Sequence, residues 1–171
     1  MITIKRAKIN DAQLLSQLGR STYTESHGGF IADKNDLQIY LDETFSIKRM
    51  EAELADAEIL YVIARNNDVP IGYAKLILNT SHEKMNSSMN CRLDKIYSKA
   101  EFFPLKAGQK LLFFLEDEAR KLVYKSMWLV VYVKNKRAIR FYEKNGFITI
   151  DTCDFLVNGK PYENIVFSKT L

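Results

Sequence analysis

The stretch from Met127 to Phe147 constrains the fold of this chain more than any other. It opens with an apolar run, MWLVVYV, in which the Tyr132 hydroxyl is the one side-chain hydroxyl. A run so short and so rich in Val and aromatic residues is typical of a strand buried on both faces. Asn135 is a favourable helix N-cap, and Gly146 suits the left-handed position just after a helix. The stretch therefore predicts a buried strand, a capped helix and the start of another strand.

Hydrophobic periodicity and turn residues predict helices and strands along the rest of the chain. In chain order we expect a strand at 1–7, a helix capped by Asn10-Asp11, a loop or helix end at 24–33, helices at 34–43 and 46–57, strands at 59–66 and 69–79 joined by Asn67-Asp68, a polar hairpin tip at 80–88, a strand at 89–97, a loop at 98–106, a helix at 107–125, a strand at 127–133, the helix after Asn135, and a hairpin at 147–171 around Asn158-Gly159. Strands 89–97 and 127–133 are joined through a helix, so they should run parallel with a right-handed crossover. No repeat or linker divides the chain, and we expect a single domain over residues 1–171.

The composition narrows the class of protein. With 171 residues, 47% of them hydrophobic and 27% charged, the chain is typical of one soluble globular domain. It contains no run of ~18 apolar residues that could span a membrane, and its N-terminal segment lacks the apolar core of a signal peptide. We therefore expect a cytoplasmic protein with no membrane partner, in which Cys91 and Cys153 are reduced, buried and not metal ligands.

The two halves of the chain differ in charge. Residues 1–90 carry 10 Lys or Arg and 12 Asp or Glu, a balance of −2, whereas residues 91–171 carry 15 and 9, a balance of +6. A basic half suits a polyanionic ligand such as a phosphorylated cofactor or nucleic acid. The basic residues are spread over several predicted elements, and no basic arm, zinc spacing or helix-turn-helix pattern accompanies them. Nucleic-acid binding is therefore a distant alternative.

The start of the predicted helix at 107–125 has the composition of a phosphate-binding site. Ala107, Gly108 and Gln109 are small or uncharged, while Lys106 and Lys110 add positive charge beside them. A helix N-terminus presents free N–H groups and a positive dipole end, and small residues let a phosphate approach. A plain connection between a strand and a helix would have the same pattern, so this motif alone leaves both interpretations open.

At Asn135–Phe147 the sequence reads N-x-x-A-I-x-F-Y-x-x-x-G-F, which resembles the GNAT superfamily of acetyl-CoA-dependent N-acetyltransferases. Further similarity lies in W-L-x-V at 128–131 and K-I-Y at 95–97, and the order of elements matches over nearly the whole chain. The N-terminal half is similar to PaiA-type enzymes, which acetylate spermidine and spermine. The residues that carry this second similarity are Tyr40-Leu41, Phe45, Glu53-Leu54, Gly72-Tyr73 and Lys169-Thr170-Leu171.

The resemblance implies an α/β (α+β) fold: one domain with a mixed, mostly antiparallel sheet of six to seven strands, a central parallel pair splayed into a V, and flanking helices. Acetyl-CoA would lie between strands 89–97 and 127–133 as co-substrate, with no metal. The cofactor-binding residues it implies are Ile96, Tyr97, Ser98, Phe103, Lys106, Ala107, Gly108, Gln109, Lys110, Asn135, Ala138, Phe141 and Lys144. The chain departs from the family in its phosphate loop, where Phe103 replaces an Arg or Gln and Lys106 replaces a glycine.

Tyr142 has the family role of general acid toward the leaving thiolate. A phenol with a pKa near 10 stays protonated at neutral pH, and it can pass a proton to a thiolate of pKa about 8.5 when held close. Asp94, near the end of the central strand, is our candidate for the base. Glu25 and His27 are candidates for binding the acceptor, because they follow the first helix, where this family often builds its acceptor wall.

We therefore expect an acetyl-CoA-dependent N-acetyltransferase that acts on a small amine, with a polyamine such as spermidine or spermine as the leading acceptor. One alternative is acetylation of a peptide N-terminus or of an antibiotic amine. A second alternative is a catalytically weak CoA-binding regulatory module. The sequence leaves the oligomeric state open, and a homodimer could use Phe102-Phe103 or the C-terminal hairpin as its contact surface.

Overall fold

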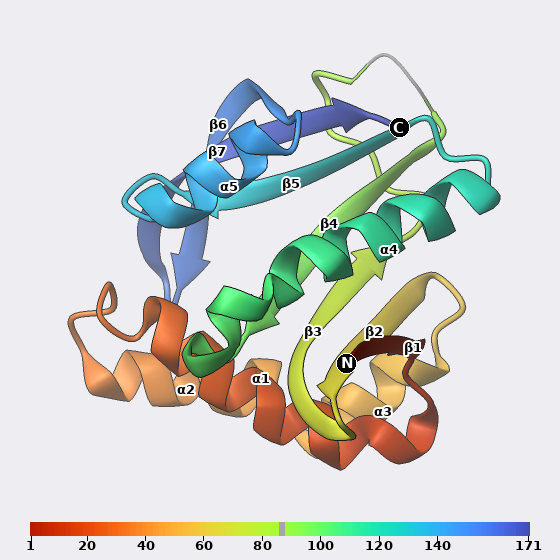
Figure 1. The fold of residues 1–171 in the computed structure, drawn as a ribbon. Coiled ribbons are helices and arrows are strands. Elements are labelled where there is room, and N and C mark those ends of the chain that lie inside the picture. The colour runs from red at the N-terminus through yellow and green to blue at the C-terminus, as the bar shows by residue number, and fades with distance from the viewer. Residues whose placement is uncertain (86–87) are drawn as a thin grey trace.

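A computed structural model describes residues 1–85 and 88–171 of the chain. Over these residues the chain forms an α+β fold in which one mixed sheet is flanked by helices (Figure 1). The elements are β1 (Ile2–Arg6), η1 (Ile9–Asp11), α1 (Ala12–His27), α2 (Lys34–Thr44), α3 (Ile47–Ala55), β2 (Ile59–Asn66), β3 (Val69–Ile77), β4 (Asn90–Ser98), η2 (Ala100–Leu105), α4 (Ala107–Lys121), β5 (Ser126–Tyr132), α5 (Lys136–Lys144), β6 (Ile148–Val157) and β7 (Lys160–Thr170), where η marks a short 3-10 helix.

The seven strands lie in the order β1-β2-β3-β4-β5-β7-β6. Every neighbouring pair is antiparallel except β4 and β5, which confirms the expected parallel pair. This pair is in register only where 90–92 meets 126–128, although β4 runs on to Ser98 and β5 to Tyr132. Beyond that short contact the two strands diverge, as Figure 1 shows. The sheet is therefore splayed into a V.

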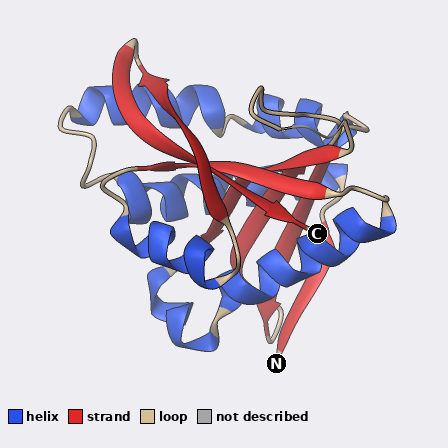
Figure 2. Ribbon diagram, turned by 90° about the horizontal axis from the view of Figure 1, so that it is seen from above, coloured by secondary structure: helices blue, strands red, loops and turns tan. Residues whose placement is uncertain are grey.

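Helices cover both faces of the sheet, as the view from above shows (Figure 2). α4 packs against β2, β3 and β4 on one face, while α1 packs against β3 and β4 on the other. α2 reaches the C-terminal hairpin at β6. Two hydrophobic cores result, one between the sheet and α4 and one between the sheet and α1–α3. The open end of the V is thus enclosed by helices and by the hairpin.

Local signals account for several element boundaries. The Asn135 side chain accepts a hydrogen bond from the Ala138 N–H at 3.1 Å and caps α5, as expected. Gly146 follows α5 with a φ of 85°, a conformation that glycine adopts without a side-chain clash. Asn158 and Gly159, at φ values of 47° and 74°, form the two-residue turn between β6 and β7.

The C-terminus of α4 differs from the expected one at Lys125. Val123 adopts a left-handed φ of 63°, which ends the helix at Lys121. The Val123 N–H donates to the Arg120 carbonyl and the Tyr124 N–H donates to the Ala119 carbonyl, both at 3.0 Å. This is a Schellman motif, in which the left-handed position is usually glycine. A β-branched residue gives no sequence signal for such an end, because it rarely takes this conformation.

Three other expectations need adjustment. The segment 98–106 contains the 3-10 helix η2 rather than an irregular loop. Asp11 does not cap α1 through its side chain, which instead accepts the Lys8 N–H at 2.8 Å beneath η1. Cys91 is buried as expected, but Cys153 is only half-buried. Of the polar tip expected at 80–88, positions 86–87 lie outside the described residues.

Candidate active site

A cavity of about 570 Å³ opens where β4 and β5 diverge. It extends from the N-terminus of α4 to the inner faces of α1, α2 and the β6–β7 hairpin. All the residues that the sequence proposed for the site line this cavity except Glu25 and Lys110. The cavity has two parts: a half between α4 and α5, and a half between β4, α1, α2 and the hairpin, which we call the acceptor half.

The half between α4 and α5 has an open helix N-terminus. Ala107 and Gly108 begin α4, and a methyl group added at Gly108 would meet no atom within 4 Å. Lys106 precedes them in the left-handed conformation, with a φ of 56°. The N–H groups of the first helical turn, which lack partners within a helix, therefore lie beside a lysine and next to the open space at Gly108. This arrangement can bind an anion such as a pyrophosphate.

Arg137, on α5, is a lining residue that sequence reasoning missed. Its guanidinium carbon lies 4.0 Å from the centre of the Phe103 ring, a cation–π contact across the mouth of the cavity. This contact joins η2 to α5 and holds a positive charge near the start of α4. The N-x-x-A-I pattern does not specify the residue at position 137. The one signal in the sequence was the unusual Phe103, and its partner on α5 is distant in the sequence.

Tyr142 lines the cavity from α5, with its ring packed against Phe141, Phe147 and Phe167. The side chain is buried, and burial raises the pKa of its phenol above the ordinary value of 10. The hydroxyl makes no hydrogen bond within residues 1–85 and 88–171, and its proton is free for another partner. Tyr142 is therefore a protonated phenol at the point where the strands separate.

Asp94 lies at a β-bulge on β4. Lys75 of β3 is in register with Lys95 and Leu76 is in register with Leu93, so Asp94 is the extra residue. As a result the Asp94 and Lys95 side chains meet, with Lys95 Nζ 2.8 Å from Asp94 Oδ2. Lys75 Nζ also lies 3.4 Å from that oxygen, and Arg92 Nη2 lies 3.4 Å from Asp94 Oδ1.

These three cations decide the protonation of Asp94. Burial alone would raise the pKa of the carboxyl, but Lys95, Lys75 and Arg92 outweigh burial and hold the pKa well below its ordinary range. A carboxylate with so low a pKa is a weak base. The geometry therefore argues against the expected role of Asp94 as general base, although the residue does line the cavity.

Aromatic rings build the wall of the acceptor half. His27 stacks on Tyr23 with ring centres 4.6 Å apart, and it meets the edges of Phe30 and Tyr97. Its Nδ1 lies 2.7 Å from Ser26 Oγ. Burial, helped by the charge of Arg137, lowers the pKa of His27 from 6.5 to about 4. His27 is therefore neutral at physiological pH.

The GNAT acetyltransferase family model matches residues 22–147, which is most of the chain. The chain belongs to the GNAT acetyltransferase family. The acetyltransferase is therefore expected to use acetyl-CoA as its co-substrate, and the open α4 N-terminus and the splayed strands fit that molecule. Acetyl transfer to an amine is the general reaction of such a chain.

Solved structures share the fold of this GNAT acetyltransferase. A PaiA N-acetyltransferase from Thermoplasma acidophilum, in complex with coenzyme A, is 22% identical, covers 100% of this chain and 99% of its own, and has a TM-score of 0.82. The ribosomal-protein-S18-alanine N-acetyltransferase from Escherichia coli is 17% identical, with coverage of 99% and 94% and a TM-score of 0.72. An N-acetyltransferase from Staphylococcus aureus Mu50 is 16% identical, with coverage of 99% and 97% and a TM-score of 0.75. At these identities the likeness establishes the fold alone.

Two proposed site residues lie outside the main cavity of this acetyltransferase. The Glu25 carboxylate accepts the Ala100 N–H at 2.9 Å and so joins α1 to η2. Lys110 lies one turn into α4 and does not line the cavity. Glu25 thus contacts the loop that carries Phe103, rather than the acceptor half.

The described residues of the acetyltransferase contain no group of three or more His, Cys, Asp or Glu side chains arranged to hold a metal ion. Nor do the helices of the described ranges include one that is long and apolar enough to cross a membrane.

Proposed function

We propose that this acetyltransferase moves the acetyl group of acetyl-CoA to the primary amine of a small molecule, with Tyr142 as general acid. The observation that carries this proposal is the buried, protonated Tyr142 phenol, which lines the cavity at the opening of the V. Acetyl-CoA would bind with its pyrophosphate at the N-terminus of α4, where Gly108, Lys106 and Arg137 surround open space. Its amide-bearing arm would follow the edge of β4 that faces β5, beyond the short stretch where these two strands pair.

The proposed transfer is direct. The amine nitrogen attacks the thioester carbonyl carbon, the C–N bond forms, and the C–S bond breaks. The sulfur leaves as a thiolate, and the Tyr142 hydroxyl delivers the proton that converts it to a thiol. The nitrogen releases its own surplus proton to water, and water restores the Tyr142 proton. Atoms and charges balance in an N-acetyl amide and free coenzyme A.

Deprotonation of the amine does not require a dedicated base. An amine of pKa about 10.4 is mostly protonated at pH 7, and removing that proton costs about 4.6 kcal/mol in water. Positive charges nearby disfavour the ammonium form and lower the pKa of a bound amine. Lys95 and Arg92 line the cavity and supply such charges. The acceptor half therefore favours the free amine that the attack needs.

A polyamine is the acceptor suggested by the PaiA-like features of the sequence, and the fold likeness to the Thermoplasma acidophilum PaiA enzyme is consistent with it. The charges of the acceptor half oppose it. Among the residues that the structure describes, Asp94 is the one carboxylate that lines the cavity, and three cations are paired with it. We therefore propose acetylation of an amine without assigning a polyamine as the acceptor.

Release of coenzyme A thiol from acetyl-CoA, measured with a panel of amines, tests the proposed reaction. We expect Tyr142→Phe to lower kcat about 100-fold or more while the KM for acetyl-CoA stays within a few fold, because loss of a general acid affects the transition state. Tyr124→Phe is the matched control, since that phenol is buried outside the cavity and bonds to Asn79 at 2.8 Å. An unchanged kcat in Tyr142→Phe would contradict the general-acid role. Binding of coenzyme A without turnover of any amine would favour a regulatory module instead.

A further inference from the structure

We propose that the acceptor amine also carries a carboxylate, on a body with an aromatic or other flat apolar group, so that the smallest suitable acceptor is an aromatic amino acid. This inference rests on the proposed acetylation of an amine in this cavity. It departs from a polycationic acceptor such as spermidine.

A cluster of charged side chains lies at the acceptor half, and its charge favours an acceptor that carries a carboxylate. Glu53, on α3, lies 2.8 Å from Lys75 Nζ and 3.0 Å from Arg49 Nε, and it also accepts the Tyr61 hydroxyl at 2.5 Å. Asp94 is paired with Lys75, Lys95 and Arg92. The cluster thus holds Lys75, Lys95 and Arg92 around two carboxylates, and the exposed Arg49 adds a fourth cation at its edge. Neither carboxylate has a charge left to pair with an ammonium.

Two cations of this cluster line the cavity. Lys95 and Arg92 line it, whereas Glu53 of α3 and Lys75 of β3 do not. The Arg92 Nε atom is buried and has no hydrogen-bond partner in the described part of the chain. A buried guanidinium N–H without a partner needs an acceptor, and a carboxylate oxygen is the acceptor that arginine binds best.

The other polar groups of the acceptor half reinforce this preference. Burial raises the pKa values of the Tyr23 and Tyr97 phenols, so both remain protonated and able to donate. His27 is neutral and adds no negative charge. Asn164 also lines the cavity; its side-chain NH2 donates to the Tyr162 carbonyl at 2.6 Å, and its Oδ1 adds one neutral acceptor. Donors and positive charge therefore exceed acceptors, and each additional ammonium on a ligand adds repulsion.

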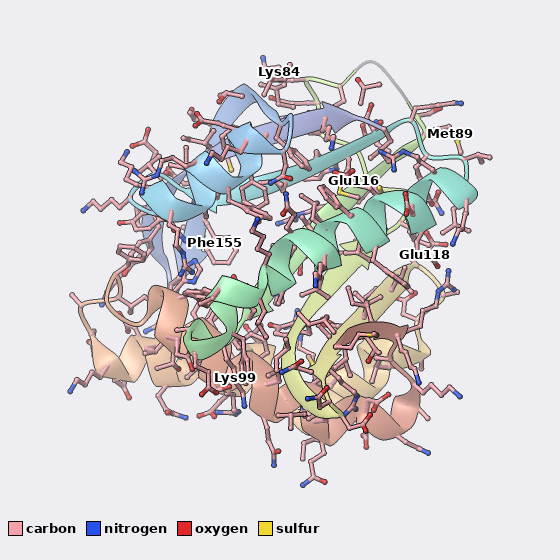
Figure 3. All side chains as sticks on the ribbon, in the orientation of Figure 1. Lys84, Met89, Lys99, Glu116, Glu118 and Phe155 are labelled. Atoms are coloured by element: carbon pink, nitrogen blue, oxygen red, sulfur yellow. The ribbon has the colours of Figure 1, made fainter. Side chains whose placement is uncertain are left out.

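Aromatic rings form the apolar lining of the acceptor half. The Tyr40 ring meets the edge of Phe155 at a centre-to-centre distance of 6.2 Å, and Tyr132 meets both Phe30 and Tyr162 in the same manner at 5.4 and 5.6 Å. All five rings line the cavity. In Figure 3 the labelled Phe155 lies on the C-terminal hairpin, on the side that faces the N-terminal helices. Such a wall matches a ring or another flat apolar group.

Matched acceptors test the charge directly. We would compare L-tyrosine with L-tyrosinamide, L-phenylalanine with L-phenylalaninamide, and spermidine, using thiol release at fixed acetyl-CoA. The amides keep the ring and the amine but lack the carboxylate. A carboxylate also raises the pKa of the neighbouring amine, so intrinsic reactivity favours the amides. We expect each free acid to exceed its amide about tenfold in kcat/KM, because a charge-assisted hydrogen bond is lost in the amide, and spermidine to rank last. Preference for an amide or for spermidine would overturn the proposal.

Substitutions trace the preference to the two cations. Lys95→Gln and Arg92→Gln should each reduce the acid-to-amide ratio toward one, and two variants are used because either could lose stability with a buried partner removed. Lys125→Gln, an exposed lysine outside the cavity, should leave the ratio unchanged. Melting temperatures verify that each variant is folded. A ratio that persists in both cavity variants would also overturn the assignment.

A binding measurement separates this inference from the proposed reaction. Calorimetric titration of the same five compounds into the chain saturated with coenzyme A reports acceptor affinity without chemistry. If the free acids bind more tightly than the amides and no compound is turned over, the result contradicts the proposed reaction and supports the acceptor assignment. Turnover of spermidine, together with tighter binding of spermidine, would do the reverse. Absence of binding and turnover for both free acids would overturn the acceptor assignment.

Discussion

Arg137 and Phe103 together place a positive charge at the cavity where the family pattern would place an Arg or Gln in the loop. The resemblance to the family leads one to expect an Arg or Gln at position 103, and the chain has a phenylalanine there. That ring now supports the Arg137 guanidinium of α5 at 4.0 Å. Because a stacked guanidinium keeps its N–H groups at its edge, it can still bind a phosphate while the ring fixes its plane. A positive charge on α5 thus lies across from Lys106 at the start of α4, and both residues line the cavity.

We expect Arg137→Gln to weaken coenzyme A binding about tenfold at low salt and less at high salt, since the lost contact is electrostatic. Titration calorimetry at two ionic strengths measures both effects. Arg140→Gln, an exposed arginine on the same helix that does not line the cavity, is the matched control. Equal affinities for Arg137→Gln and Arg140→Gln would show that Arg137 does not bind the coenzyme.

His27 should make stability depend on pH. Its pKa is lowered to about 4 in the folded chain, chiefly by burial, whereas in the unfolded chain it titrates near 6.5. Protonation therefore favours unfolding. The stability that a neutral His27 provides is complete above pH 6.5 and is lost as the pH falls from 6.5 toward 4, by up to about 3 kcal/mol.

His27→Phe removes this titration and keeps a ring to stack on Tyr23. As the pH is lowered from 7.5 to 4.5, we expect the melting temperature of the original chain to fall relative to that of the variant. Scanning calorimetry across this range measures the difference. A difference that stays constant with pH would contradict the assignment of a buried neutral His27.

At the scale of elements, two glycines set the geometry of the cavity in opposite ways. Gly72, on β3, faces β4 so closely that an added Cβ would lie 2.6 Å from the Tyr97 carbonyl oxygen. Gly108, at the start of α4, has nothing within 4 Å of an added Cβ. The first glycine lets two strands approach where β4 runs along the cavity. The second leaves space that a ligand can enter.

We expect Gly72→Ala and Gly108→Ala to separate folding from ligand binding. Gly72→Ala should destabilise the fold by about 1–3 kcal/mol, because backbone atoms must move apart. Gly108→Ala should leave stability unchanged or raise it by up to about 1 kcal/mol, because alanine favours a helix. Its affinity for coenzyme A should nevertheless fall about tenfold, since the methyl group fills the phosphate cradle. Urea unfolding and calorimetric titration of both variants give the comparison, and reversed effects would contradict it.

The elements differ in how much of them the sequence could predict. The β5–α5 unit was predictable because Asn135 and Gly146 mark its ends locally, and the parallel pairing followed from the helix between the two strands. The end of α4 at Lys121 was not predictable, because valine rarely adopts the left-handed conformation that Val123 has here. Arg137 was missed for a related reason: its role depends on Phe103, a distant residue in the sequence.

The expectation of a polyamine had the same weakness. It drew on the PaiA-like residues of the chain, and such a resemblance does not state which carboxylates remain unpaired in the folded chain. In the folded chain Glu53 is bonded to Lys75 and Arg49, and Asp94 is paired with three cations of the sheet. The bulge that turns Asp94 and Lys95 to the same side also has no signal in the alternation of the strand.

At the scale of the molecule, α4 ties together the two halves of the splayed sheet. Glu118 accepts a hydrogen bond from Arg6 Nε of β1 at 2.9 Å, and Glu116 pairs with Lys169 Nζ of β7 at 2.6 Å. Figure 3 labels both glutamates on this helix, which crosses the molecule diagonally. Because the Glu116 side chain is only 4% exposed, its charge depends on these partners. The width of the V is therefore set partly by one helix.

Lys169→Met should destabilise the fold by about 3 kcal/mol, because it leaves the buried Glu116 with only the more distant Arg120 at 3.4 Å. The double variant Glu116→Leu with Lys169→Met should regain most of that loss, since it buries no unpaired charge. Urea midpoints of the single and double variants measure the coupling. Equal stability of the Lys169→Met chain and the original would contradict a role for this pair in holding the halves together.

The short pairing of β4 with β5 also leaves two unpaired strand edges inside the molecule. Past Arg92 and Trp128, β4 still pairs with β3 and β5 with β7. The edges that face each other each carry a row of backbone N–H and C=O groups that no strand of the described residues pairs with. An extended ligand with its own amides can complete such a row, as a peptide does when it adds a strand to a sheet. Coenzyme A, which carries amides in its arm, would then serve as a surrogate strand. Binding of coenzyme A would then supply hydrogen-bond partners to the unpaired strand edges, so that ligand binding also completes the hydrogen bonding of the sheet.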